Sequence, residues 1–81
     1  MSTLIDKAKK VYYLDGYVHI DMESGAALKF PISMNPVLSS ASARELQNIE
    51  LSPFGIHWPL LDEDLSFDGI LRGDFGQYYK R

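Results

Sequence analysis

Two turn signals near the start of the chain constrain the fold most, because they divide the first third of the sequence into three β-prone runs. Asp15-Gly16 is a strong hairpin dipeptide, and Glu23-Ser24-Gly25 marks a second turn. Between them, residues 17–22 alternate apolar and polar side chains with the period of a half-buried strand. We therefore expect a three-stranded antiparallel meander, with strands at residues 11–13, 17–22 and 26–32.

The middle of the chain carries the clearest helix signal, over residues 38–48. Ser42 followed by Glu45 is a capping box, and helix-forming residues lie around it. Since the residue before a proline avoids the helical region, no helix should start before Pro36. A helix of about two turns does not stand alone, so its Leu46 side should pack on the sheet.

Prolines limit the strands on both sides of this helix. Pro31 ends the third strand or places it at a sheet edge, because proline donates no ladder hydrogen bond. Further short strands are expected at residues 49–52 and 56–58, and Pro59 should stop the second of them. Trp58 is interpreted as a core anchor, because a tryptophan buries a large apolar area; the alternative is a partly exposed interface residue.

The expected fold is α+β, an antiparallel sheet made of a three-stranded meander plus two further short strands, with one or two short helices. Ser66 looks like the N-cap of a last helical turn, which Gly73 should end. The expected organisation is a lead-in at residues 1–10, a single domain at 11–73 and a flexible aromatic tail at 74–81.

Composition excludes several functional classes. The 81 residues contain no cysteine, which rules out disulfides and thiolate metal sites. A net charge of −3 and a pI near 5.1 argue against nucleic-acid binding by the domain on its own. No apolar run is long enough to cross a membrane, and no signal-peptide core is present, so we expect a cytoplasmic protein without a membrane partner.

The densest polar cluster is Asp62-Glu63-Asp64, close to His57 in the sequence. Acidic side chains could bind a hard cation or act with the histidine as acid and base. The spacing matches neither a calcium loop nor a catalytic triad element. A structural reading is favoured, in which the trio meets the N-terminal dipole of the following helical turn. We expect no catalytic residue, metal or cofactor.

Aromatic residues are concentrated at the first hairpin and in the tail. Tyr12, Tyr13 and Tyr17 could share an outer face, as a base-stacking platform or as a surface for another protein. The protein surface is favoured because no lysine or arginine is expected to flank these rings. Tyr78 and Tyr79 are expected to support partner binding from the tail.

From Leu28 onward the chain resembles a small bacterial family, domain of unknown function family 2442. The likeness is carried by Phe30-Pro31-Ile32, Ser42-Ala43-Arg44-Glu45, Asn48, the block Gly55-Ile56-His57-Trp58-Pro59-Leu60-Leu61-Asp62-Glu63-Asp64-Leu65-Ser66, and Gly69-Ile70-Leu71-Arg72-Gly73. The resemblance implies a small α+β fold whose members occur alone or fused to a helix-turn-helix domain. It also implies a gene pair resembling a toxin and its antitoxin, and it supplies no catalytic residues. The segment from residue 74 lies beyond this likeness.

These observations favour a non-enzymatic protein-interaction module, the antitoxin-like half of a two-gene pair. The expected partner is a protein, such as the product of a neighbouring gene, and an unpaired strand edge makes a homodimer a further expectation. The surface predicted to bind it comprises His57, Asp62, Glu63 and Asp64, supported by Tyr78 and Tyr79. Alternatives are a transcription-linked accessory module that contacts DNA only within an oligomer or complex, and a hydrolase or metal protein that uses His57 with Asp62 or Asp64.

Overall fold

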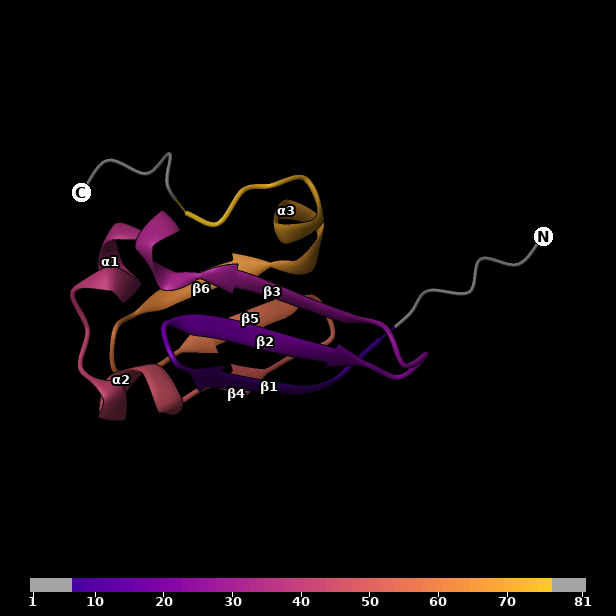
Figure 1. Cartoon of the computed structure of the whole chain (residues 1–81), viewed down its shortest axis with the longest axis horizontal. Coiled ribbons are helices and arrows are strands. Elements are labelled where there is room, and N and C mark those ends of the chain that lie inside the picture. The colour runs from indigo at the N-terminus through magenta and orange to yellow at the C-terminus, as the bar shows by residue number, and fades with distance from the viewer. Residues whose placement is uncertain (1–6, 77–81) are drawn as a thin grey trace.

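In the computed structural model, which describes residues 7–76, the first sheet is the predicted meander (Figure 1). Strands β1 (Ala8–Leu14), β2 (Tyr17–Met22) and β3 (Ala27–Pro31) pair antiparallel in the order β1-β2-β3. The tight turn between β1 and β2 holds Asp15 and Gly16 at φ values of 52° and 85°. These left-handed values explain why an Asp-Gly pair suits the hairpin.

Strand β1 begins earlier than expected. It starts at Ala8 rather than residue 11, so the last three residues of the expected lead-in belong to the sheet. The pairing with β2 is irregular between Ala8 and Lys10. Strand β3 ends at Pro31 and lies at the sheet edge, as predicted from the missing proline donor.

The single helix predicted at residues 38–48 is in fact two short helices. A 3-10 turn, η1 (Ile32–Met34), leads into α1 (Pro36–Ser39), and α2 (Ala43–Gln47) follows after a break. The capping box is confirmed: the Ser42 hydroxyl accepts from the Glu45 backbone, and Glu45 Oε1 accepts from the Ser42 backbone. A cap with its own start signal in the middle of the expected helix is the reason for the break.

The second sheet contains a strand that the sequence did not predict. Strands β4 (Glu50–Leu51), β5 (Gly55–Trp58) and β6 (Glu63–Ser66) pair antiparallel in the order β4-β5-β6. The last helix, α3 (Phe67–Leu71), follows directly and is capped by the Ser66 hydroxyl, which accepts from Gly69 N. The α+β class is confirmed, with two sheets in place of one.

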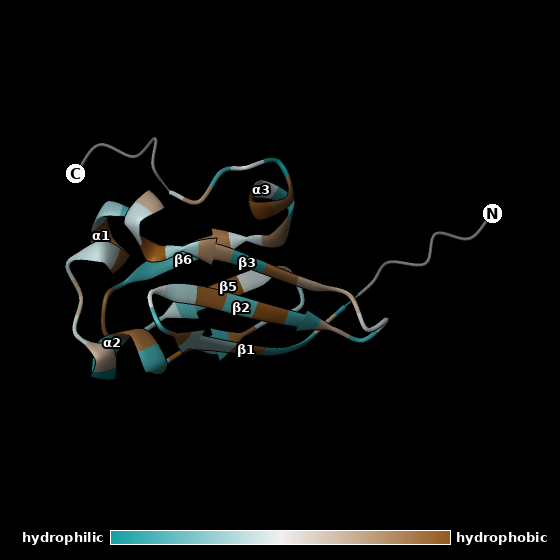
Figure 2. Ribbon diagram, in the orientation of Figure 1, coloured by the Kyte–Doolittle hydropathy of each residue, from teal (hydrophilic) through white to brown (hydrophobic). Residues whose placement is uncertain are grey.

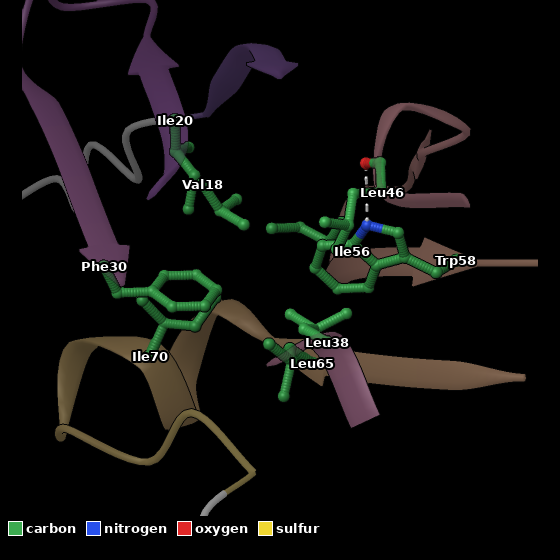
Figure 3. Packing of buried hydrophobic residues seen from close by; sticks show 9 residues of the cluster. All are labelled: Val18, Ile20, Phe30, Leu38, Leu46, Ile56, Trp58, Leu65 and Ile70. Atoms are coloured by element: carbon green, nitrogen blue, oxygen red, sulfur yellow. Dashed lines mark hydrogen bonds between the residues drawn. The ribbon is translucent and has the colours of Figure 1, made fainter. Parts of the chain in front are cut away.

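The core lies between the two sheets and under the helices (Figure 3). Inward residues of β2 and β3 meet those of β5, β6 and the helices, a set that comprises Val18, Ile20, Phe30, Leu38, Leu46, Ile56, Trp58, Leu65 and Ile70. Trp58 is fully buried, and its Nε1 donates to the Leu46 carbonyl oxygen over 3.2 Å. The core-anchor interpretation of Trp58 is therefore confirmed.

Apolar residues on the ribbons alternate with polar ones along β2, as Figure 2 shows. Among residues 7–76, no helix has both the length and the apolar character that crossing a membrane requires.

Candidate functional site

The hairpin of β5 and β6 places His57 beside Asp64. The two residues are cross-strand partners, and His57 Nδ1 lies 2.5 Å from Asp64 Oδ1. Their side chains are 35% and 75% exposed, so the pair lies on the outer face of the second sheet. Strand alternation explains the arrangement, because Ile56 and Trp58 on either side of His57 point into the core.

The acidic trio does not act as one group. Asp62 sits in the hairpin turn with a φ of 52° and is exposed. Glu63 is 2% exposed, and its Oε2 accepts a hydrogen bond of 2.9 Å from Asn35 Nδ2. Of the three, Asp64 is the one that faces His57. Because Glu63 points inward, its side chain cannot form part of the surface that was predicted to bind a partner.

The trio also does not cap a helix, so that part of the structural reading is wrong. It spans the turn and the start of β6, and α3 begins only at Phe67. The Ser66 hydroxyl accepts a hydrogen bond from an N–H group at the N-terminal end of α3, and the acidic residue in the first turn of α3 is Asp68. The cause of the error is the unpredicted strand β6, which contains Glu63 and Asp64 and runs on to the start of the helix.

Asn35 is the structural residue that the sequence analysis missed. It is fully buried, and its Oδ1 accepts from the backbone of Val37 and Leu38 at the start of α1. Its Nδ2 donates to Glu63 and to the Phe75 carbonyl oxygen, 40 residues along the chain. An asparagine directly before a proline is a helix-start signature, which could have identified the cap but not the distant bonds.

A hollow of about 210 Å³ lies beside the His57–Asp64 pair. Gly55 contributes backbone alone here, since a Cβ on it would collide with the carbonyl oxygen of Leu65. Two serines also line the hollow, but Ser66 caps α3 and the Ser52 hydroxyl bonds to the Gly55 backbone. Within residues 7–76 no hydrogen bond joins either serine to His57.

Phe54 is the most exposed large apolar residue of the described chain. It is 82% exposed at the turn between β4 and β5. It lines the first hollow and also a second one of about 530 Å³, which is walled by Leu51 at the end of β4, by Pro53 from the turn, and by residues at the start of β1. Phe54 was not singled out from the sequence, because an isolated apolar residue in a turn carries no periodic signal. Leu51 was expected only as part of the strand at residues 49–52, and it lies in β4.

The first sheet carries a different set of side chains on its outer face. Tyr12 and His19 stack in parallel with ring centroids 4.9 Å apart, and Tyr17 lies tilted beside the histidine at 6.4 Å. Lys10 and Lys29 place their ammonium groups over the rings of Tyr12 and Tyr17. The expectation that no lysine flanks these rings is wrong, because β1 extends back through Lys10 and the pairing with β3 brings in Lys29.

The predicted three-tyrosine patch contains only two of its members. Tyr13 points inward and packs against the core, and its hydroxyl oxygen accepts a hydrogen bond from Gly16 N. Adjacent residues of a strand face opposite sides of the sheet, which separates Tyr13 from Tyr12. His19, for which the sequence predicts no role, completes the outer patch.

The start of the expected flexible tail packs on the domain. Phe75 stacks on Phe30 with ring centroids 4.8 Å apart, and Gly76 is buried with a φ of 92°. A Cβ on Gly76 would collide with Asn35 Nδ2, so the backbone approaches the buried amide closely. Tyr78 and Tyr79 lie outside the described residues. Within residues 7–76 no cluster of three or more His, Cys, Asp or Glu side chains could hold a metal ion.

The fold and its surface define a small two-sheet α+β protein. A family model described as protein of unknown function (DUF2442) matches residues 8–76, and the chain belongs to this family. The match extends the likeness beyond its expected limits at both ends: it begins at Ala8 instead of Leu28 and includes the packed residues 74–76. A comparison with curated proteins gave no match.

Two solved structures resemble the chain. A protein of unknown function from Rhodospirillum rubrum is 33% identical, with a TM-score of 0.82 over 93% of this chain and 95% of the other. An uncharacterized protein from Chromobacterium violaceum, solved by NMR, is 26% identical, with a TM-score of 0.76 over 89% of this chain and 70% of the other. These comparisons establish the family and the fold and assign no activity.

Proposed function

We propose that this chain is a non-enzymatic protein-interaction module whose binding surface centres on Phe54. The observation that carries the proposal is the 82% exposure of this ring between two hollows. Aromatic side chains and adjoining pockets at the centre of an interface supply most of its binding energy. Burying a phenylalanine side chain contributes about 1.5–3 kcal/mol, which corresponds to an affinity factor of tens.

The His57–Asp64 pair forms one rim of this surface. Both side chains are solvent-accessible and line the smaller hollow, so they can exchange hydrogen bonds with a partner. Asp62 lies in the turn at the other end of this hairpin from Phe54 and lines neither hollow, and the buried Glu63 is also left out. Polar groups at a rim fix orientation and contribute less to affinity than the buried centre.

The finer proposal is that the partner is the product of a neighbouring gene and that the chain is the antitoxin-like member of the pair. This proposal rests on the family resemblance and on the exposed apolar surface around Phe54, which a protein partner would cover. The alternative, an accessory module that contacts DNA within an oligomer, is favoured by one observation: all four lysines among the described residues lie on the first sheet or next to it.

The test is a tagged capture from the native cell at physiological salt after nuclease treatment, read by mass spectrometry. We expect one dominant stoichiometric protein. Phe54→Ser should lower its affinity about 30-fold, because roughly 2 kcal/mol of apolar burial is removed. Leu71→Ser is the matched control, since Leu71 is also exposed, at 69%, but lies on α3. Capture that is absent, or equal for both variants, contradicts the proposal.

A further inference from the structure

The outer face of the first sheet is a second surface, separate from the one around Phe54. On β2 the side chains of Val18 and Ile20 point into the core, so Tyr17, His19 and Asp21 point outward. Figure 1 draws no helix across the face of β2. The residues opposite the outward three on the neighbouring strands complete the face, namely Leu14, Tyr12, Lys10, Pro31, Lys29 and Ala27.

The rings of this face form a short row, with Tyr12 stacked on His19 and Tyr17 tilted beside it, and a cation lies at each end. The planes of the Tyr12 and His19 rings are nearly parallel, 5° apart, and the Lys10 ammonium lies 5.1 Å from the centre of the Tyr12 ring. At the other end, the Lys29 ammonium lies 4.8 Å from the centre of the Tyr17 ring. Both lysines are exposed, so each can leave its ring without uncovering the core.

Charge is distributed unevenly between the two parts of the molecule. Residues 7–31 contain four lysines against three carboxylates, whereas residues 32–76 contain two arginines against seven carboxylates. Although the whole chain has a net charge of −3, residues 7–31 are slightly positive and residues 32–76 are strongly negative. An anionic ligand is directed to the first sheet by this separation.

We infer that this face binds single-stranded nucleic acid. Unpaired bases stack on aromatic side chains while lysines contact the phosphates, which is the combination that the face presents. On binding, Lys10 and Lys29 would move from the rings to phosphates and leave the ring faces to bases. The exchange is favourable because base–aromatic stacking is stronger than an exposed cation–π contact.

The same face discriminates against two other anions. A duplex keeps its bases stacked inside and can use only the lysines, and an acidic peptide has no bases to place on the rings. Asp21, opposite Lys10 on the face, and Asp15 in the adjoining turn repel any anion. Binding should therefore be modest and strongly dependent on salt.

The first experiment titrates the purified chain into a fluorescein-labelled oligothymidylate of about 16 nucleotides, read by anisotropy at low salt. Saturable binding is expected, at least tenfold tighter than to a duplex of equal length or to polyglutamate. Tyr12→Leu with Tyr17→Leu should weaken it at least tenfold by removing the rings while keeping apolar bulk. Tyr12→Phe with Tyr17→Phe should restore it, because phenyl rings also stack.

A second pair of variants tests the lysines. Lys10→Gln with Lys29→Gln should weaken binding and reduce the slope of log affinity against log salt by about 1.4, since each neutralised phosphate of a single strand contributes about 0.7. Arg44→Gln with Arg72→Gln is the control: it removes two exposed cations elsewhere and should leave the slope unchanged. Circular dichroism of every variant confirms that the fold is retained.

Three results would overturn the inference: no saturable binding at low salt, equal binding by the leucine variants, or equal affinity for duplex or polyglutamate. The outcome is independent of the proposed protein interaction. Phe54→Ser should leave oligothymidylate binding unchanged, and the tyrosine and lysine variants should leave protein capture unchanged.

Discussion

Residues 8–31 are joined by backbone ladders and two tight turns, whereas residues 32–76 add side-chain hydrogen bonds between distant segments to the ladders of their own sheet. In the first region Tyr12 pairs with His19 a few positions away, and the register follows from the hairpin. In the second, Asn35 reaches Glu63 and Phe75 across 28 and 40 positions. Contacts between residues close in the sequence therefore hold the first region together, whereas hydrogen bonds between distant segments are made by the second region.

The largest loss of stability is expected when Trp58, the buried anchor of the second sheet, is removed. Trp58→Ala should lower the free energy of unfolding by about 3–5 kcal/mol, since it leaves a cavity at a fully buried site and removes the bond to Leu46. For a domain this small such a loss approaches the total stability. Urea denaturation measures it, and Leu60→Ala, at a site 43% exposed, is the control. A stable, cooperatively folded Trp58→Ala variant would contradict the anchoring role.

An intermediate effect is expected at the amide that links distant segments. Asn35→Ala should cost about 2–4 kcal/mol, because a helix cap is lost and buried polar groups lose partners. Asn35→Asp separates the two functions, as it keeps the acceptors for Val37 and Leu38 but removes both donated bonds. Thermal unfolding ranks the variants. The control is Asn48→Ala, because Asn48 is exposed. Equal melting temperatures for Asn35→Ala and Asn48→Ala would contradict the stabilising role of Asn35.

The smallest effect on stability is expected at the exposed pair of the second sheet. Asp64→Asn should change the free energy of unfolding by about 0–1 kcal/mol, because solvent competes for a hydrogen bond whose carboxylate is 75% exposed. Chemical denaturation checks this value. A loss comparable to that of Asn35→Ala would mean that the pair stabilises the second sheet, which would weaken its assignment to an interaction surface.

The same contrast explains what the sequence could predict. The first hairpin, the capping box of Ser42 and the inward Trp58 all have signals within a few residues, and the structure confirms them. Strand β6 was missed because three consecutive carboxylates obscure its alternation, although Glu63 and Leu65 point inward.

The candidate site was predicted less completely, since its members meet only through strand pairing. His57 was paired with Asp62 or Asp64 only in the hydrolase or metal alternative, and the sequence did not decide between the two carboxylates. Phe54 carried no local signal. Lys29 reaches the Tyr17 ring from β3, and only the pairing of β2 with β3 brings the two side chains together. Such neighbourhoods follow from the register, which a single sequence does not specify.

The short connections of the first sheet have a consequence for the order of folding. Its two hairpins close small loops and can form within microseconds, yet an isolated hairpin is marginally stable in water. Closing the 40-residue separation between Asn35 and Phe75 carries a greater entropic cost, so this contact should form late. The early meander would thus be transient until the later segment covers Val18 and Ile20, and the rate of unfolding would be set largely by release of that later segment.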